Sequence, residues 1–126
     1  MGYDIHIERR EDEPGITLDE WRAAVGSAPG ARVITATRVE LGHGISQGVG
    51  PGDVELYFAD DGQWTPVFRT GERDDGSIRI ATRATALGQP AVLAFLRHVT
   101  SVLDAVVVGD EGEQYDPATG DALERN

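Results

Sequence analysis

The chain of 126 residues contains no cysteine and no lysine. Without cysteine it has no disulfide, no thiolate nucleophile and no cysteine-ligated zinc. No apolar run approaches the roughly 20 residues that cross a membrane, and residues 1–13 lack the basic start and apolar stretch of a signal peptide. We therefore expect a cytoplasmic protein that binds no membrane.

Charge is distributed unevenly along the chain. Eleven basic residues, all arginine, are opposed by 22 acids, which gives a formal net charge of -11. Residues 104–126 hold seven of these acids and one arginine. A nucleic-acid backbone would be repelled by such a surface, so no nucleic acid is expected as a partner. The asymmetry predicts a basic protein partner instead.

The length predicts one domain, because a chain of this size buries roughly two-thirds of its unfolded surface. Hydrophobic residues make up 40% of the sequence, enough for a core. We expect a single α+β domain over residues 1–116 and a frayed tail over residues 117–126.

Both ends of the predicted domain carry recognisable secondary-structure signals. Alternating apolar and polar residues over 3–9 predict a strand. Thr17 and Glu20 have the spacing of a capping box, at the start of a helix that buries Trp21 and Val25. Ala105–Val108 is apolar throughout, which predicts a buried strand near the first one.

The pattern of residues 31–83 predicts an antiparallel β-meander. Alternating hydrophobicity indicates four strands, over residues 31–41, 53–59, 64–69 and 77–83. A second helix begins at Pro90, with an apolar stripe formed by Val92, Phe95, Leu96, Val99, Val102 and Leu103. The order β-α-β-β-β-β-α-β predicts the α+β class, a single antiparallel β-sheet with two helices packed on one face.

The glycine-rich segment 42–52 invites comparison with a phosphate-binding loop. A strand rather than a helix is predicted to follow it, and the Gly-Lys-Ser/Thr sequence is missing, so we expect a mobile hairpin loop. A small-molecule-binding protein or hydrolase is the alternative function, using this loop and the adjacent sheet, with His43, Ser46 and Trp64 as ligand contacts.

Other chemistry finds little support in the sequence. The three histidines, at 6, 43 and 98, lack the spacing of a local metal motif, and the acidic clusters lack the ligand pattern of a calcium loop. No serine is held beside a base and an orienting acid by a recognisable pattern. We therefore predict no catalytic residue, no metal site and no cofactor.

Five arginines fall mostly on the polar side of predicted strands, namely Arg32, Arg38, Arg69, Arg79 and Arg83. Because no aromatic pair lies among them, an RNA-binding sheet is disfavoured. We expect a solvated sheet face on which nearby acids balance these charges.

Three short stretches carry a resemblance to other proteins. They are Tyr3–Ile7 ending in Arg9, the helix start Thr17–Trp21, and Gly109–Glu113 with Tyr115. Together they resemble a group of small uncharacterised bacterial cytosolic proteins, some of which look like immunity proteins of secreted-toxin systems. The resemblance implies an α+β fold and a binding role without catalysis, and it does not extend to residues 31–83.

The leading hypothesis is a non-enzymatic protein-binding module whose acidic C-terminal surface meets a basic protein. Its expected contact residues are Asp110, Glu111, Glu113, Tyr115 and Asp116. A purely structural or self-associating domain is a third option, and the sequence leaves open whether the protein is a monomer or a dimer.

Overall fold

The computed structural model describes residues 3–10, 12–36 and 38–123, with the backbone alone for residues 38–41 and 45–47. Along the chain the elements are β1 (Asp4–Arg9), α1 (Leu18–Gly26), β2 (Ala31–Val33), β3 (Arg38–Gly42), β4 (Ile45–Gly48), β5 (Val54–Phe58), β6 (Gln63–Glu72), β7 (Ile78–Arg83), the 3-10 helix η1 (Ala84–Gly88), α2 (Pro90–Leu103), β8 (Ala105–Gly109) and β9 (Gln114–Tyr115). The α+β class with a single main sheet is confirmed.

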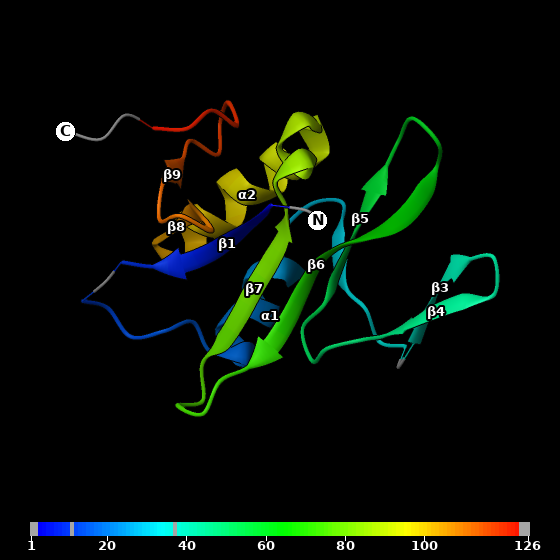
Figure 1. The fold of residues 1–126 in the computed structure, drawn as a ribbon, viewed down its shortest axis with the longest axis horizontal. Coiled ribbons are helices and arrows are strands. Elements are labelled where there is room, and N and C mark those ends of the chain that lie inside the picture. Colours follow the sequence, from blue (N-terminus) through cyan, green and yellow to red (C-terminus); the bar gives the residue numbers. More distant parts are fainter. Residues whose placement is uncertain (1–2, 11, 37, 124–126) are drawn as a thin grey trace.

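The main sheet has its strands in the order β2-β5-β6-β7-β1-β8-β9, and all neighbouring pairs are antiparallel. β1 lies between β7 and β8, with Asp4 opposite Arg83 and Ile5 opposite Gly109. The predicted strand at 105–108 therefore lies beside the first strand, as expected. This pairing brings the N-terminal strand and the C-terminal segment together (Figure 1).

Both α-helices lie on one face of the sheet, as predicted (Figure 1). Their packing centres on Trp21 of α1 and Phe95 of α2, whose ring centroids are 5.8 Å apart, with Phe68 of β6 5.0 Å from Phe95. Ile5 and Ile7 of β1 point toward the same core and are 1% and 3% exposed. Alternate residues of the strands thus provide the apolar face that the helices cover.

The start of α1 matches its prediction. Thr17 accepts a hydrogen bond from the Glu20 backbone N–H through its side chain, and the Glu20 carboxylate accepts one from the Thr17 N–H. Both carboxylate oxygens of Glu20 also accept hydrogen bonds from the Arg9 guanidinium, at 3.1 and 2.6 Å. The capping box therefore also ties α1 to the end of β1.

The apolar stripe of α2 differs from the prediction at Val102, which is 55% exposed. At about 100° per residue, Val102 lies at the margin of the stripe centred on Val99 and Leu103. Thr100 is buried on the opposite margin, where its hydroxyl donates to the Leu96 carbonyl at 2.7 Å. That local bond satisfies the hydroxyl inside the core.

The single strand predicted over 31–41 is wrong. β2 ends at Val33 and pairs with β5, whereas β3 begins at Arg38 and pairs with β4 in a separate two-stranded sheet. Between them, Ile34 is buried and its N–H donates to the Asp53 carbonyl. Val33 and Val39 share one phase of the alternation on the two sides of the break, whereas the apolar Ile34 falls on the opposite phase and interrupts it.

The C-terminal residues close the edge of the sheet. Ala122 forms a bridge with Tyr115 of β9, and the Leu123 N–H donates to the Gln114 carbonyl at 2.7 Å. The part of the predicted frayed tail that the structure describes, residues 117–123, is thus hydrogen-bonded to β9. Glu124 and Arg125, which belong to the acidic tail of the sequence, lie outside the described residues.

Candidate functional site

The expected contact residues lie in the turn after β8 and in β9. Asp110 begins this turn, and its carboxylate accepts a hydrogen bond from the Asp4 backbone N–H at 3.0 Å. Its other oxygen lies 2.8 Å from His6 Nε2. The hydrogen bond to His6, followed by that from Asp4, lowers the pKa of Asp110. The carboxylate is therefore held in place by β1 and remains ionised at neutral pH.

Glu113 is held by two tyrosines. The Tyr3 hydroxyl donates to its carboxylate and also accepts the Glu111 backbone N–H, while Tyr115 donates to the same carboxylate at 3.4 Å. Desolvation, together with the bond to Glu113, raises the pKa of Tyr3 to about 12. The bond from Tyr3 lowers the pKa of Glu113. Glu113 is therefore an oriented anion whose donors carry no charge.

The remaining acids of this region face solvent more freely. Glu111 is exposed, and Asp116 is half-buried and caps the next turn by accepting the Ala118 N–H at 2.8 Å. Asp121 follows and is exposed. We call Asp110, Glu111, Glu113, Asp116 and Asp121 the acidic edge. Across the described residues, no arginine forms an ion pair with any of the five.

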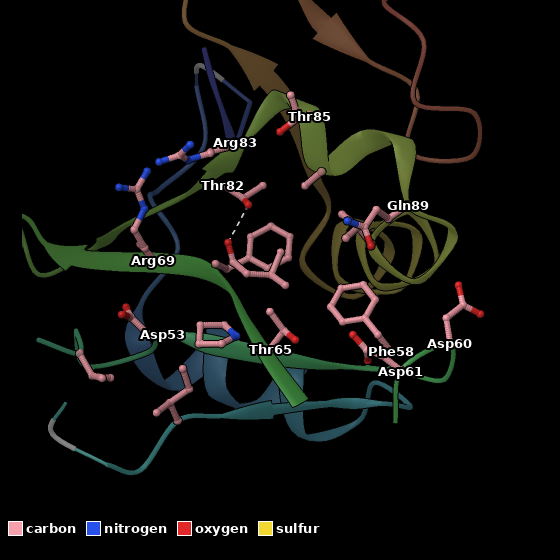
Figure 2. A pocket seen from close by; sticks show the side chains of 17 residues that line it. Asp53, Phe58, Asp60, Asp61, Thr65, Arg69, Thr82, Arg83, Thr85 and Gln89 are labelled. Carbon is pink, nitrogen blue, oxygen red and sulfur yellow. Dashed lines mark hydrogen bonds between the residues drawn. The ribbon is translucent and has the colours of Figure 1, made fainter. Parts of the chain in front are cut away.

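A second feature is a groove of about 700 Å³ where β6 leaves β7. Only Arg69–Glu72 of β6 pair with β7, because the first part of β6 follows β5 instead. Where the strands part, the Thr82 hydroxyl donates to the Val67 carbonyl at 2.6 Å. The β5–β6 hairpin forms one wall of the groove, and the end of β7 with η1 and the start of α2 forms the other (Figure 2).

Polar groups of opposite charge line this groove at its two ends. Figure 2 shows the guanidiniums of Arg69 and Arg83, from neighbouring strands, near one another on one side of the groove, with Asp60 and Asp61 on the other side. Arg69 donates to the Asp4 carboxylate at 3.1 Å. No ion pair of Arg83 occurs within the part of the chain described.

The floor of the groove is apolar at its centre and polar at one side. Phe68 is almost fully buried there, and Phe58 is half-buried. Asp53 is 7% exposed, and its Oδ1 accepts hydrogen bonds from both the N–H and the hydroxyl of Thr70, at 2.7 and 2.9 Å. These two bonds compensate for burying the carboxylate.

The residues predicted for small-molecule binding lie elsewhere. His43 is exposed in the β3–β4 turn with a positive φ of 53°, and Ser46 lies in β4, where the structure describes the backbone alone. Trp64 of β6 packs beneath Arg32, whose guanidinium carbon lies 3.9 Å from the ring centroid. Neither His43 nor Trp64 lines the groove.

Two of the predicted arginines are balanced by acids, as expected for a solvated face. Arg32 pairs with Glu55 on the neighbouring strand, and Arg69 pairs with Asp4. Arg79 and Arg83 are exposed, and the Arg38 side chain is not among those described. The sheet face therefore carries both signs of charge.

Within the described residues, no three His, Asp or Glu side chains gather in a way that could hold a metal ion. His6 is engaged with Asp110, and His98 lies 2.8 Å from the Ser27 hydroxyl. None of the described helices is long and apolar enough to cross a membrane.

Comparison with protein-family models, with curated proteins and with solved structures finds no match to this chain. The geometry of the molecule itself therefore carries the functional argument.

Sequence reasoning missed the lining of the groove and the three β1 residues that anchor the acidic edge. Pro66 was one available signal for the groove, since a proline inside a strand cannot donate a hydrogen bond and is typical of a strand edge. For Tyr3, Asp4 and His6 the alternation indicates a strand, but it does not say which turn lies beside that strand.

Proposed function

We propose that this chain is a non-enzymatic protein-binding module whose acidic edge receives a basic protein. The observation that carries the proposal is that the carboxylates of the acidic edge are oriented by neighbouring side chains but not neutralised by arginine. Asp110 and Glu113 are oriented by His6, Tyr3 and Tyr115, and no described arginine is paired with the acidic edge. Their negative field is therefore available to a partner.

The position of the acidic edge also supports the proposal. β9 is a two-residue strand at the end of the sheet, and its outer side is covered by the bridge from Ala122 to Tyr115 and the hydrogen bond from the Leu123 N–H to Gln114. Glu111 and Asp121 beside it are exposed. A short, covered edge flanked by acids resists pairing with other sheets. It leaves a charged surface that a cationic partner can approach without displacing any part of the fold.

Because the resemblance at both ends of the sequence concerns bacterial cytosolic proteins, the form we propose is an immunity protein that neutralises a basic toxin in the cytoplasm. Charge complementarity of this kind raises the association rate by about 10- to 1,000-fold. It also makes the rate depend strongly on salt, since the Debye length is about 8 Å at physiological ionic strength.

The test begins with capture of a partner on the immobilised chain at low salt, followed by identification of that protein. Association rates are then compared for the native chain and for the double variant Glu111→Lys with Asp121→Lys. These two side chains make no hydrogen bond in the described residues, so the fold is expected to survive. We expect at least a tenfold slower association and a weaker dependence on salt.

The matched control is Asp12→Lys with Asp74→Lys, which changes the net charge equally in two distant exposed turns. The proposal requires this control to retain most of the association rate. Equal losses in both double variants would mean that overall charge, rather than the acidic edge, governs binding. A captured partner with an acidic surface would also contradict the proposal.

A further inference from the structure

We propose that the groove between the β5–β6 hairpin and the β7–η1–α2 segment binds a small organic monocarboxylate with an apolar body. This inference is independent of the proposed protein partner, because none of the five residues of the acidic edge lines the groove. Its volume of about 700 Å³ lies within the range of about 300–1,000 Å³ that is usual for small-molecule sites.

The cationic end of the groove provides the anchor for a carboxylate. Arg83 is exposed and forms no ion pair within the described part of the chain, and Arg69 extends beside it from the neighbouring strand. An arginine fork matches the geometry of a carboxylate and can donate two parallel hydrogen bonds. Arg83 is therefore the first contact, with Arg69 as its neighbour.

The charge balance at this end favours a single negative charge over two. Arg69 already donates to the Asp4 carboxylate, and the buried Asp53 carboxylate is compensated by Thr70. Among the described residues this leaves the Arg83 guanidinium as the one positive charge at this end without an ion pair, which matches a monoanion better than a dianionic phosphate. The net charge of -11 further disfavours a doubly charged ligand.

The rest of the groove defines the body of the ligand. Phe58 and Val67, both half-buried, provide apolar surface in the groove. Asp60 and Asp61 lie at the far end, across from the arginines (Figure 2). These acids would repel a second carboxylate, so the distal end of the ligand is neutral or cationic.

The three probes share one aromatic body and differ in the polar group attached to it: 2-naphthoate carries one negative charge, 2-naphthol is neutral at pH 7, and 2-naphthyl phosphate carries up to two. Each is titrated into the full chain labelled with nitrogen-15, and amide shifts are followed by NMR. We expect 2-naphthoate to bind most tightly, with shifts confined to residues 34, 49, 53, 58–69 and 82–92 and their direct neighbours. Tighter binding of the phosphate or of the naphthol would overturn the proposal, as would scattered shifts or none.

Two arginine variants distinguish a specific contact between Arg83 and the carboxylate from a general effect of positive charge on binding. Arg83→Gln is expected to weaken 2-naphthoate binding about tenfold, the effect of losing a charge-assisted hydrogen bond. Arg79→Gln is the control, because Arg79 is also exposed on β7 but does not line the groove. Equal weakening in both variants contradicts a local anchor.

The apolar part of the groove is tested by Thr65→Trp, which places a large side chain at an exposed position of the lining. Loss of 2-naphthoate binding, with the amide spectrum of β1 and β8 unchanged, supports the assignment. If this folded variant binds 2-naphthoate as tightly as the native chain, the ligand lies elsewhere and the proposal fails.

Discussion

His6 and Asp110 lie 2.8 Å apart although 104 positions separate them in the sequence. The same carboxylate accepts the Asp4 backbone N–H, so the turn after β8 is attached to β1 by two bonds. A contact of this kind closes nearly the whole chain into one loop. It forms only when β1 occupies its place between β7 and β8.

Asp110→Ala removes the acceptor of both bonds. We expect faster hydrogen exchange at the Asp4 amide and a lower thermal midpoint, because β1 and the turn lose their attachment. Glu111→Ala is the control, since Glu111 is next to Asp110 in the chain and its carboxylate makes no hydrogen bond within the described residues. Equal exchange at Asp4 in the two variants would show that the bond contributes little.

The Tyr3 pKa of about 12 predicts an alkaline transition. Because folding raises this pKa above its ordinary value of about 10, its stabilising contribution is complete below pH 10 and is lost as the pH rises toward 12. The phenolate absorbance of the native chain should therefore include a step near 12. Tyr3→Phe should remove that step, and the step should persist in Tyr57→Phe, which alters an exposed tyrosine.

The lowered pKa of Glu20 predicts that the stability of the fold decreases at acidic pH. Its pKa is lowered to about 2, mainly by hydrogen bonds from Arg9 and then from Thr17. The stabilisation it provides is present above the ordinary value of 4.5 and is lost as the pH falls toward 2.

Glu20→Gln is therefore expected to lower the free energy of unfolding at pH 7 by at most about 1 kcal/mol, since the Glu20 side chain is 40% exposed. Urea unfolding of both proteins should show this difference shrinking between pH 4.5 and pH 2. Glu8→Gln, at an exposed position of β1, should show no such convergence.

Trp21 is the most consequential aromatic residue of the core. It is fully buried, and its indole N–H donates to the Gly52 carbonyl at 2.8 Å. Trp21→Phe leaves that carbonyl without its partner and opens a cavity, so we expect a loss of about 2–3 kcal/mol in urea unfolding. Trp64→Phe, on the sheet face beneath Arg32, should cost less than about 1 kcal/mol. Similar losses at both sites would contradict this account.

Gly52, whose carbonyl accepts the Trp21 indole N–H, also packs closely against the Trp21 side chain. A Cβ atom at Gly52 would lie 2.9 Å from Trp21 Cδ1 and 3.0 Å from Leu18 Cδ1. Gly52→Ala is therefore expected to destabilise the fold, whereas Gly26→Ala, where nothing lies within 4 Å of the added atom, should not. The thermal midpoint of unfolding distinguishes the two variants. An unchanged midpoint in Gly52→Ala would mean that the backbone around position 52 shifts to make room for the added atom at little cost.

The best-predicted parts of the fold depend on short-range signals. The capping box at Thr17 and the proline at position 90 mark helix starts that involve only the next few residues. Four residues of the acidic edge, Asp110, Glu111, Glu113 and Asp116, were also predicted from sequence, because they lie close together in the chain, whereas Asp121 fell in the tail predicted to fray. By contrast, the break between β2 and β3 depends on which strand each half pairs with, and the alternation is the same on both sides.

The sequence by itself determined the α+β class, both helices, the buried faces of β1, β5 and β7, and the charge of the C-terminal segment, since each is encoded in residues a few positions apart. Only the tertiary structure decided that Tyr3, Asp4 and His6 anchor the acidic edge, and that Arg83 and Phe58 share a groove. The physical reason is that side-chain periodicity gives the face on which a residue lies but not its neighbour across the sheet. That neighbour is set by the strand order, which depends on the packing of the whole chain.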